Sequence, residues 1–280
     1  MAKDIKVLRK RIKSFNSTLH LTGAMGLVAS SKMRRATDAM LEGRKYLKGV
    51  TDVVTDLVKT PDCRKSIYFD NKCDEPLTRL IVIAGDRGLC GGYNANVFRL
   101  VRDMDNIDVL PIGKRAFDRY TDYEETEDDL VENNVYESSE YYTYDKAMEL
   151  AKQCVIDYKE GRIDKVGIVY NKYVSIMTQV PEVKWILPLD RPEEGDISTG
   201  VYEPDALELL EDLIPQYVAG VLYSLVKESF ACEVAARRMA MDSAKKNATE
   251  MIENLQLEYN RVRQGKITQE ITEIVAGSGK

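Results

Sequence analysis

Apolar and small residues recur at alternating steps of three and four along the first 57 residues. That spacing is the a/d pattern of a coiled-coil helix. The positions that follow it are Ile5, Leu8, Ile12, Phe15, Leu19, Thr22, Gly26, Ala29, Met33, Ala36, Met40, Gly43, Leu47, Val50, Val54 and Leu57. No proline occurs before Pro61, whereas a core helix of a globular domain usually runs about 8–20 residues. The pattern predicts one long helix, and the small residues in its middle allow a partner helix to approach closely.

A second long helical pattern begins near Asp205 and continues to Val275. Asp205 followed by Glu208 is similar to a capping box, and no proline follows Pro215. The apolar and small positions are Met241, Ala244, Ala248, Met251, Leu255, Ile267, Ile271 and Ile274. At 1.5 Å per residue such a helix is roughly 100 Å long, which exceeds the width of a lone domain of this size. We therefore expect it to project from the domain or to pair antiparallel with the first helix, along most of residues 5–57 and 212–275.

Between the two long patterns the period changes to that of an α/β domain. Residues 59–77 contain two prolines and several Asp and Asn residues, which favour a linker. Strands are predicted at 80–84, 107–112, 165–173 and 176–187, and helices at 95–104, 114–120 and 144–159. Residues 121–142 are acidic and irregular, and 189–204 form a loop. Alternating strands and helices predict a mainly parallel sheet, with the last two strands paired.

The resulting fold prediction is an α/β protein. A long antiparallel coiled coil of the N- and C-terminal helices accompanies a central Rossmann-like α/β domain. The expected domains are 1–60 (N-terminal helix), 77–204 (α/β domain) and 205–280 (C-terminal helix).

The glycine-rich loop 85–94 (GDRGLCGGYN) sits where α/β proteins bind phosphate, between a strand and a helix. It lacks both the P-loop spacing and G-x-G-x-x-G, which favours a tight turn with close helix–sheet packing over nucleotide binding. Cys90 could act as a nucleophile at a helix start, but the single histidine, His20, lies in the N-terminal helix. The carboxylates at 124–132 read as a solvated acidic run. We expect no catalytic residue, metal or cofactor.

Composition narrows the class of protein further. The formal net charge is −6 and the pI is near 5.2, which argues against a general nucleic-acid binder. No apolar run approaches the ~20 residues that span a bilayer, and residues 1–20 lack the apolar core of a secretory signal. The five cysteines are scattered without a C-x-x-C pair, which is typical of free thiols in a reducing cytosol.

The predicted N-terminal helix is basic on its outer faces. Its cations are Lys3, Lys6, Arg9, Lys10, Arg11, Lys13, Lys32, Arg34, Arg35, Arg44, Lys45 and Lys48. Such a stripe is either a solvated face or a surface that meets an acidic partner.

Three motifs carry a family resemblance. They are LTGAMGLVASSKM at 21–33, the glycine loop 85–94, and Arg263-Gln264 with Ile267-Thr268-Gln269-Glu270, followed by Glu273, Ile274, Val275 and Gly277. Together, and in this order, they resemble the gamma subunit of F-type ATP synthase over the whole chain. Ser278 departs from the alanine usual in that family. The long redox-regulatory insertion of the plastid form is absent, so no thiol regulation is assigned to Cys63 or Cys73.

The resemblance implies a rotor shaft with no catalytic activity of its own. The two terminal helices would turn inside a hexamer of alpha and beta subunits, whose beta subunits hold the catalytic sites. The α/β domain would stand on the membrane ring of c subunits beside the epsilon subunit. Flow of protons or sodium ions would turn the ring and the shaft. The complex would lie on the cytoplasmic face of the cell membrane as a peripheral assembly.

Site residues follow from the same resemblance, position by position. Those matching hexamer-contact positions are Met25, Lys32, Arg237, Gln264, Thr268 and Glu270, and those matching ring-contact positions are Tyr202 and Glu203. For Met25 the alternative is coiled-coil packing, and for Glu203 it is a solvated loop acid. Two other functions stay open at this point: a nucleotide-binding α/β enzyme and a coiled-coil adaptor that does not rotate.

Overall fold

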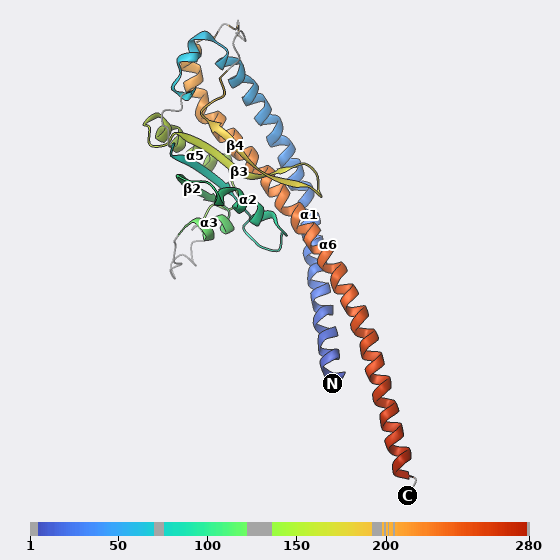
Figure 1. The fold of residues 1–280 in the computed structure, drawn as a ribbon. Helices are drawn as coiled ribbons and strands as arrows, with labels where there is room; N and C mark the ends of the chain where they lie inside the picture. Colours follow the sequence, from blue (N-terminus) through green and yellow to red (C-terminus); the bar gives the residue numbers. More distant parts are fainter. Residues whose placement is uncertain are drawn as a thin grey trace, which may run out of the picture. The chain divides into compact units, whose positions relative to one another are not determined.

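The structure is a computed structural model that describes residues 5–69, 76–121, 136–191, 198, 200, 202–203 and 205–278. The long helices α1 (Ile5–Val58) and α6 (Ala206–Ser278) stand at the two ends of the sequence, with the α/β elements between them (Figure 1). Two compact units divide the chain. Unit 1 is Met1–Ser30 with Arg237–Lys280, and unit 2 is Ser31–Ala236. Each long helix thus contributes to both units.

In unit 1, α1 and α6 pair in opposite directions. The Arg9 guanidinium donates to the Tyr259 hydroxyl at 3.1 Å. A Cβ atom placed on Gly26 would lie 3.6 Å from the Cβ of Met241. From the first contact to the second, the residue number rises along α1 and falls by almost the same amount along α6. The two helices therefore run antiparallel.

The a/d positions of α1 are confirmed, because all sixteen predicted seam residues are buried or half-buried. On α6 the predicted position Met251 is wrong. Met251 is 52% exposed, whereas its neighbour Ile252 is only 8% exposed. After Ala248 the buried position comes four residues later rather than three, so Ile252 takes the seam position.

The antiparallel pairing ends before the end of α6. Every described residue from 263 to 278 is exposed, including Ile267, Ile271 and Ile274. The pairing predicted along most of residues 212–275 therefore stops before this last stretch, and Ile267, Ile271 and Ile274 are not seam positions. The reason is length: Arg9, close to the start of α1, already contacts Tyr259, so few residues of α1 are left to face the turns that follow.

Cysteines at Gly26 and Met241 should form an intramolecular disulfide. Their Cβ separation of 3.6 Å matches the roughly 3.5–4.5 Å found in disulfides. Mild oxidation of Gly26→Cys/Met241→Cys, followed by mass spectrometry of the non-reduced chain, checks this. Gly23→Cys/Met241→Cys is the control, because a Cβ on Gly23 meets nothing within 4 Å. Equal cross-linking in both variants, or bridges only between two chains, would contradict the pairing.

In unit 2 the same two helices pack through small residues. The Ser224 hydroxyl donates to the Gly43 carbonyl at 2.9 Å, and a Cβ on Gly43 would lie 3.4 Å from the Ser224 Cα. Nearby, a buried cluster combines Met33, Ala36 and Met40 of α1 with Ala231, Val234 and Ala235 of α6. The small residues predicted to allow close approach do so here.

A four-stranded sheet with the order β2-β1-β3-β4 forms the centre of unit 2. Its strands are β1 (Thr78–Ile83), β2 (Ile107–Ile112), β3 (Lys165–Tyr173) and β4 (Gln179–Leu187). β1 pairs in parallel with β2 and β3, and β4 pairs antiparallel with β3. The predicted mainly parallel sheet and the predicted pairing of the last two strands are confirmed. β4 starts at Gln179 rather than 176, because residues 174–178 form the turn between the paired strands.

The sheet is covered on both faces by the helices α2 (Tyr93–Arg102), α3 (Lys114–Tyr120), α5 (Tyr144–Lys159) and α6. Leu80, Val82 and Ala84 of the β1 segment pack with residues of α2 and α3. The alternate residues Ile81 and Ile83 join the main core with α1, α5 and α6. Because β1 is buried on both faces, its sequence from 80 to 84 is a continuous apolar run rather than an alternating one.

The segment after α1 is not the plain linker that was predicted. Residues 61–69 form two short 3₁₀ helices, Pro61–Lys65 and Ile67–Phe69. Cys63, Tyr68 and Phe69 are buried in the main core, and the Leu189 amide donates to the Tyr68 carbonyl at 2.7 Å. These apolar residues hold the segment against the domain. Residues 70–75 of the predicted linker, including Cys73, and most of the acidic run 121–142 lie outside the described residues.

One 18-residue window of α6 is apolar and long enough to pass a test for a membrane span, with a mean hydropathy of 1.2. The expectation that no run approaches that length is wrong by this measure. The structure explains the composition, since 61% of the window is buried. Residues such as Val218, Leu222 and Val226 belong to the main core.

Candidate functional site: the exposed end of α6 and the junction of the sheet with the helices

The glycine loop packs against α6. A Cβ atom on Gly85 would lie 2.7 Å from the carboxyl carbon of Glu233, a residue that is 3% exposed. The Gly85 amide donates to the Asn94 side chain at 2.9 Å. The Glu233 carboxyl group occupies the space beside Gly85, which disfavours a bound phosphate there. The predicted tight turn with close helix–sheet packing is here a loop that packs closely against α6.

The described cysteines are buried free thiols. Cys63, Cys90, Cys154 and Cys232 are buried and none is in a disulfide. Burial raises the pKa of Cys63 and of Cys154 to about 11, and that of Cys232 still further. Cys90 is 2% exposed, and its sulfur accepts from the Asn94 amide at 3.4 Å. These thiols are core residues of unit 2, whereas His20 belongs to unit 1. Among the described residues, no group of three or more His, Cys, Asp or Glu side chains is placed to hold a metal ion.

The carboxyl end of β3 makes an unusual set of contacts, which we call the β3 junction. β3 pairs with β1 only as far as Val169. Beyond it, the main-chain groups of Asn171 and Tyr173 bind side chains of the long helices instead of a strand. The Asn171 amide donates to Ser229 at 3.3 Å, and its carbonyl accepts from the Cys232 thiol at 3.2 Å.

Two residues farther along β3, the contacts involve charges. The Tyr173 amide donates to Glu228 at 2.9 Å, and the Tyr173 carbonyl accepts from Arg44 at 2.8 Å. Arg44 also donates two hydrogen bonds to the Glu228 carboxylate, at 3.0 and 2.8 Å. The Glu228 side chain is only 6% exposed. Its hydrogen bond raises the pKa of the Arg44 guanidinium, which further stabilises the charged form. The β3 junction thus ties α1, α6 and the sheet together.

A second tie links α1 to the loop before α5. Lys32 forms an ion pair with Glu140 at 2.5 Å. The Glu140 amide, the Ser139 amide and the Ser138 hydroxyl all donate to Asp86 in the glycine loop. Lys32, predicted to contact a hexamer, therefore has a partner within its own chain. Two cations of the basic stripe, Lys32 and Arg44, are thus paired inside the chain.

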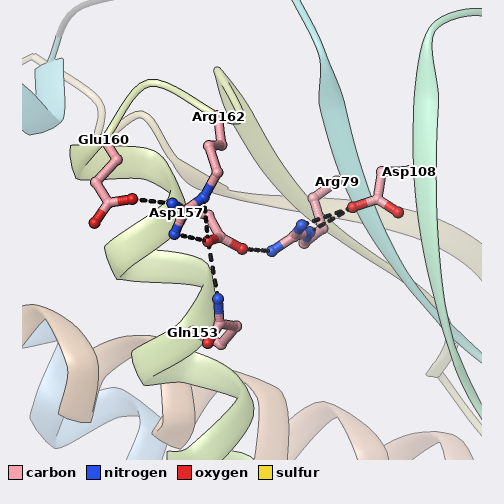
Figure 2. Close-up of polar contacts among 6 residues, drawn as sticks. All are labelled: Arg79, Asp108, Gln153, Asp157, Glu160 and Arg162. Atoms are coloured by element: carbon pink, nitrogen blue, oxygen red, sulfur yellow. Dashed lines mark hydrogen bonds and ion pairs between the residues drawn. The ribbon is translucent and has the colours of Figure 1, made fainter.

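A polar network lies at the amino ends of the parallel strands (Figure 2). Asp157 of α5 is its centre and accepts from Arg79, Arg162 and Gln153. Arg79 of β1 also donates to Asp108 of β2 at 2.8 Å. The side chains of Arg79 and Asp157 are 13% and 6% exposed. The pKa of Arg79 is raised because its two carboxylate partners outweigh its burial. The network joins β1, β2 and α5, and gives no sign of a ligand site.

The predicted ring-contact residues lie on the segment before α6. The Tyr202 hydroxyl donates to Asp56 of α1 at 2.5 Å, which leaves it partly buried. Glu203 is exposed. The structure thus uses Tyr202 to hold this segment on α1, while Glu203 remains accessible.

The remaining predicted contact residues lie in unit 1. Met25 and Arg237 are half-buried. Gln264, Thr268 and Glu270 are exposed in the last turns of α6, where Thr268 donates to the Gln264 carbonyl at 3.0 Å. The structure brings Gln264 and Thr268 together on successive turns. The β3 junction was not predicted, although one signal was present: Lys227, Glu228 and Glu233 are the charged residues in a largely apolar stretch of α6.

Two terminal helices that pair antiparallel and carry a small α/β domain between them define a helical-stalk class of protein. A family model described as ATP synthase matches residues 4–279. The ATP synthase gamma chain of Ruminococcus albus is 41% identical over 287 residues and covers 98% of both chains. The gamma chain of Acetobacterium woodii, named as sodium ion specific, is 36% identical over 304 residues and covers 99% of both. The chain belongs to the ATP synthase gamma chain family.

Solved structures agree on the fold. The chain matches one from the Euglena gracilis mitochondrial ATP synthase (OSCP/F1/c-ring) with a TM-score of 0.65 at 18% identity, covering 98% of this chain and 93% of that one. It matches one from the Tetrahymena thermophila central stalk and c-ring with a TM-score of 0.56 at 22% identity, covering 80% and 99%. At these identities the match speaks for the fold alone.

Proposed function

We propose that this chain is the central rotor shaft of an F-type ATP synthase. It couples rotation of the membrane c-ring to sequential changes at the catalytic sites of the beta subunits, and it catalyses nothing itself. The complex is a peripheral assembly associated with the membrane, and we place this chain on the cytoplasmic face of the cell membrane.

The last turns of α6 carry the proposal. Residues 263–278 are helical, and all of them are exposed. Four of them are large aliphatic residues whose exposed fractions lie between 48% and 70%: Ile267, Ile271, Ile274 and Val275. An isolated helix is marginally stable in water, and a helix in a protein gains most of its stability from packing an apolar face. A run of aliphatic side chains at helical spacing therefore calls for a partner outside the chain. The alpha and beta subunits of the hexamer are that partner in the proposed function.

The residues proposed to meet the hexamer are Met25, Lys32, Arg237, Gln264, Thr268 and Glu270. Gln264, Thr268 and Glu270 are supported by their exposure on the same stretch of α6. A contact between Lys32 and the hexamer would compete with the ion pair of Lys32 to Glu140. Glu203 is proposed to meet the c-ring, with Tyr202 holding the segment in place through Asp56. The epsilon subunit is proposed to bind beside the α/β domain.

Two alternatives are less well supported. A nucleotide-binding enzyme would need the glycine loop, but Glu233 places a buried carboxylate against Gly85. A static coiled-coil adaptor would share the fold but would not rotate. The distinction between adaptor and rotor requires a measurement of motion.

The test is purification of the tagged full-length chain from the membranes of its own cells. We expect alpha, beta, epsilon and c subunits to co-purify in a complex with ATPase activity. A bead on the c-ring, with the hexamer fixed to glass, should rotate when ATP is added. The purified chain alone should have no ATPase activity. Co-purification without rotation would support the adaptor, and turnover by the chain alone would support the enzyme.

Met25→Lys should weaken coupling more than stability. Met25 is half-buried and lies one step from the seam residue Gly26, so a lysine can direct its ammonium outward. A new charge-assisted bond to an acidic hexamer loop contributes about 1.5–3 kcal/mol, enough to slow a step about tenfold. We expect normal assembly with fewer ions pumped per ATP. Met25→Leu is the control, and a Met25→Lys complex that pumps like its parent would contradict the interface role.

A further inference from the structure

Unit 2 contains the α/β domain with residues 31–58 of α1 and 206–236 of α6. The contacts between the domain and these helix segments are of two kinds. One is an apolar core shared by β1, β3, α1, α5 and α6. The other is the set of directed polar contacts made by the β3 junction and by Lys32. Hydrophobic burial is non-directional, so it resists separation of the sheet from the helices better than sliding. Hydrogen bonds between charged groups with two parallel contacts fix the geometry.

The β3 junction is the stronger of the two polar ties. Lys32 and Glu140 have side chains that are 41% and 25% exposed, and exposed ion pairs contribute little. Glu228, by contrast, is 6% exposed, and its carboxylate accepts from both Arg44 and the Tyr173 amide. Four main-chain groups of β3, the amides and carbonyls of Asn171 and Tyr173, are all satisfied by helix side chains. Any sliding of the sheet along α6 must break these bonds together.

We propose that the β3 junction is the element that transmits torque from the α/β domain to the two long helices, with Arg44 and Glu228 as its positioning residues. This inference rests on the proposed rotor function. The c-ring would push on the α/β domain, and the ATP-driven hexamer would push on the helices. The two loads would meet at Glu228, where α1, α6 and the end of β3 share one carboxylate. Neither residue would touch a nucleotide or a reacting atom.

The test measures the torsional stiffness of the rotor in the assembled complex. The hexamer is fixed to glass, and a bead is bound to the α/β domain through Arg102→Cys, a position whose side chain is 65% exposed. At a catalytic pause, the variance of the bead angle reports the compliance between the domain and the hexamer. The junction variant is Arg44→Met/Glu228→Gln, which removes both charges together and so avoids leaving one buried charge unpaired. Arg44→Lys keeps the charge but loses the two-bond grip.

Two controls separate stiffness from stability. Arg79→Met weakens the buried network of Figure 2 within the α/β domain, away from the β3 junction. Lys172→Gln removes an exposed ion pair to Glu182 on the outer side of β3. Thermal unfolding of each purified chain shows how much stability each variant has lost.

We expect the angular variance to rise at least twofold in Arg44→Met/Glu228→Gln and by a smaller amount in Arg44→Lys. ATP-driven ion pumping should fall at least threefold in the double variant, while unloaded ATPase activity stays within twofold of the parent. Both controls should keep the parental variance, even where Arg79→Met melts at a lower temperature. An unchanged variance in the double variant, or an equal rise in Arg79→Met, would overturn the proposal. If the double variant does not assemble, Arg44→Lys gives the same comparison. A parent complex that does not rotate would refute the rotor function itself, before any variant is compared.

Discussion

Asp157→Asn should lower the free energy of unfolding of the chain by about 3–5 kcal/mol, the usual cost of breaking a buried ion pair on one side. The Asp157 carboxylate holds Arg79, Arg162 and Gln153 at once, and its side chain is 6% exposed. An asparagine cannot neutralise Arg79, which is 13% exposed and would keep only Asp108. Denaturant unfolding, followed by the fluorescence of the single tryptophan Trp185 on β4, measures the change.

The same carboxylate should make stability depend on pH. Burial favours the neutral acid, but the hydrogen bonds from Arg79 and Arg162 outweigh it and hold the pKa of Asp157 below its ordinary value. A depressed folded pKa adds stability that is fully present above the unfolded pKa of about 3.9. That stability is lost as the pH falls through the lower folded pKa. The parent should therefore lose stability below about pH 4, and Asp157→Asn should lack this component.

Asp103→Asn is the matched control for both measurements. The pKa of Asp103 is also lowered, by its hydrogen bond with Arg102, but this ion pair is exposed to solvent. We expect its unfolding curve to overlay that of the parent at neutral pH. If Asp103→Asn and Asp157→Asn behave alike, the network in Figure 2 does not stabilise the domain.

Deletion of residues from 263 onward should leave the free chain as stable as before but impair the assembled complex severely. The described part of this stretch, 263–278, is exposed throughout, so its loss removes no core contact. In the complex, each buried aliphatic side chain contributes about 1.5–3 kcal/mol, and four are lost together. We expect ATP-driven ion pumping to fall at least tenfold, with a melting temperature of the free chain within about 2 °C of the parent.

A full-length variant separates apolar contact from helix length. Ile267→Ser/Ile271→Ser/Ile274→Ser keeps the tail and should lose most of the pumping activity as well. Leu257→Ser is the control, because Leu257 is 70% exposed but precedes the tail. A deleted chain that pumps at the parental rate, or one that unfolds more easily on its own, would show that the tail is not a hexamer contact.

The regular elements could be predicted from the sequence because each has a clear period. The a/d spacing identified α1, and β2, α3, α5 and β3 were predicted at their observed limits. Burial shared between distant segments could not be predicted in the same way. Cys63, Tyr68 and Phe69 follow Pro61 in a stretch typical of a linker, and only the folded chain shows that they enter the core. Met251 and Ile252 are both apolar, so the choice between them depends on the phase of α6 against α1.

The β3 junction could be predicted least. Arg44 is one of many cations on α1, and nothing in its neighbours distinguishes it from Lys45 or Lys48. Its partner Glu228 is far away in the sequence, and the other partner is a main-chain group of Tyr173, which has no residue-specific signature. The residues proposed to contact the hexamer and the c-ring were assigned from family motifs. Experiments on the assembled complex are needed to test them.

The residues of the β3 junction are also synthesised at different times. Asn171 and Tyr173 are translated well before Ser229, Glu228 and Cys232, which supply their hydrogen bonds. Until those residues leave the ribosome, the Tyr173 amide and both main-chain groups of Asn171 lack the partners that they have in the folded chain. An unsatisfied strand edge is a site for pairing with another chain. A nascent gamma chain therefore stays exposed to misassembly until about four-fifths of its length has been made, and it closes this edge with its own last helix.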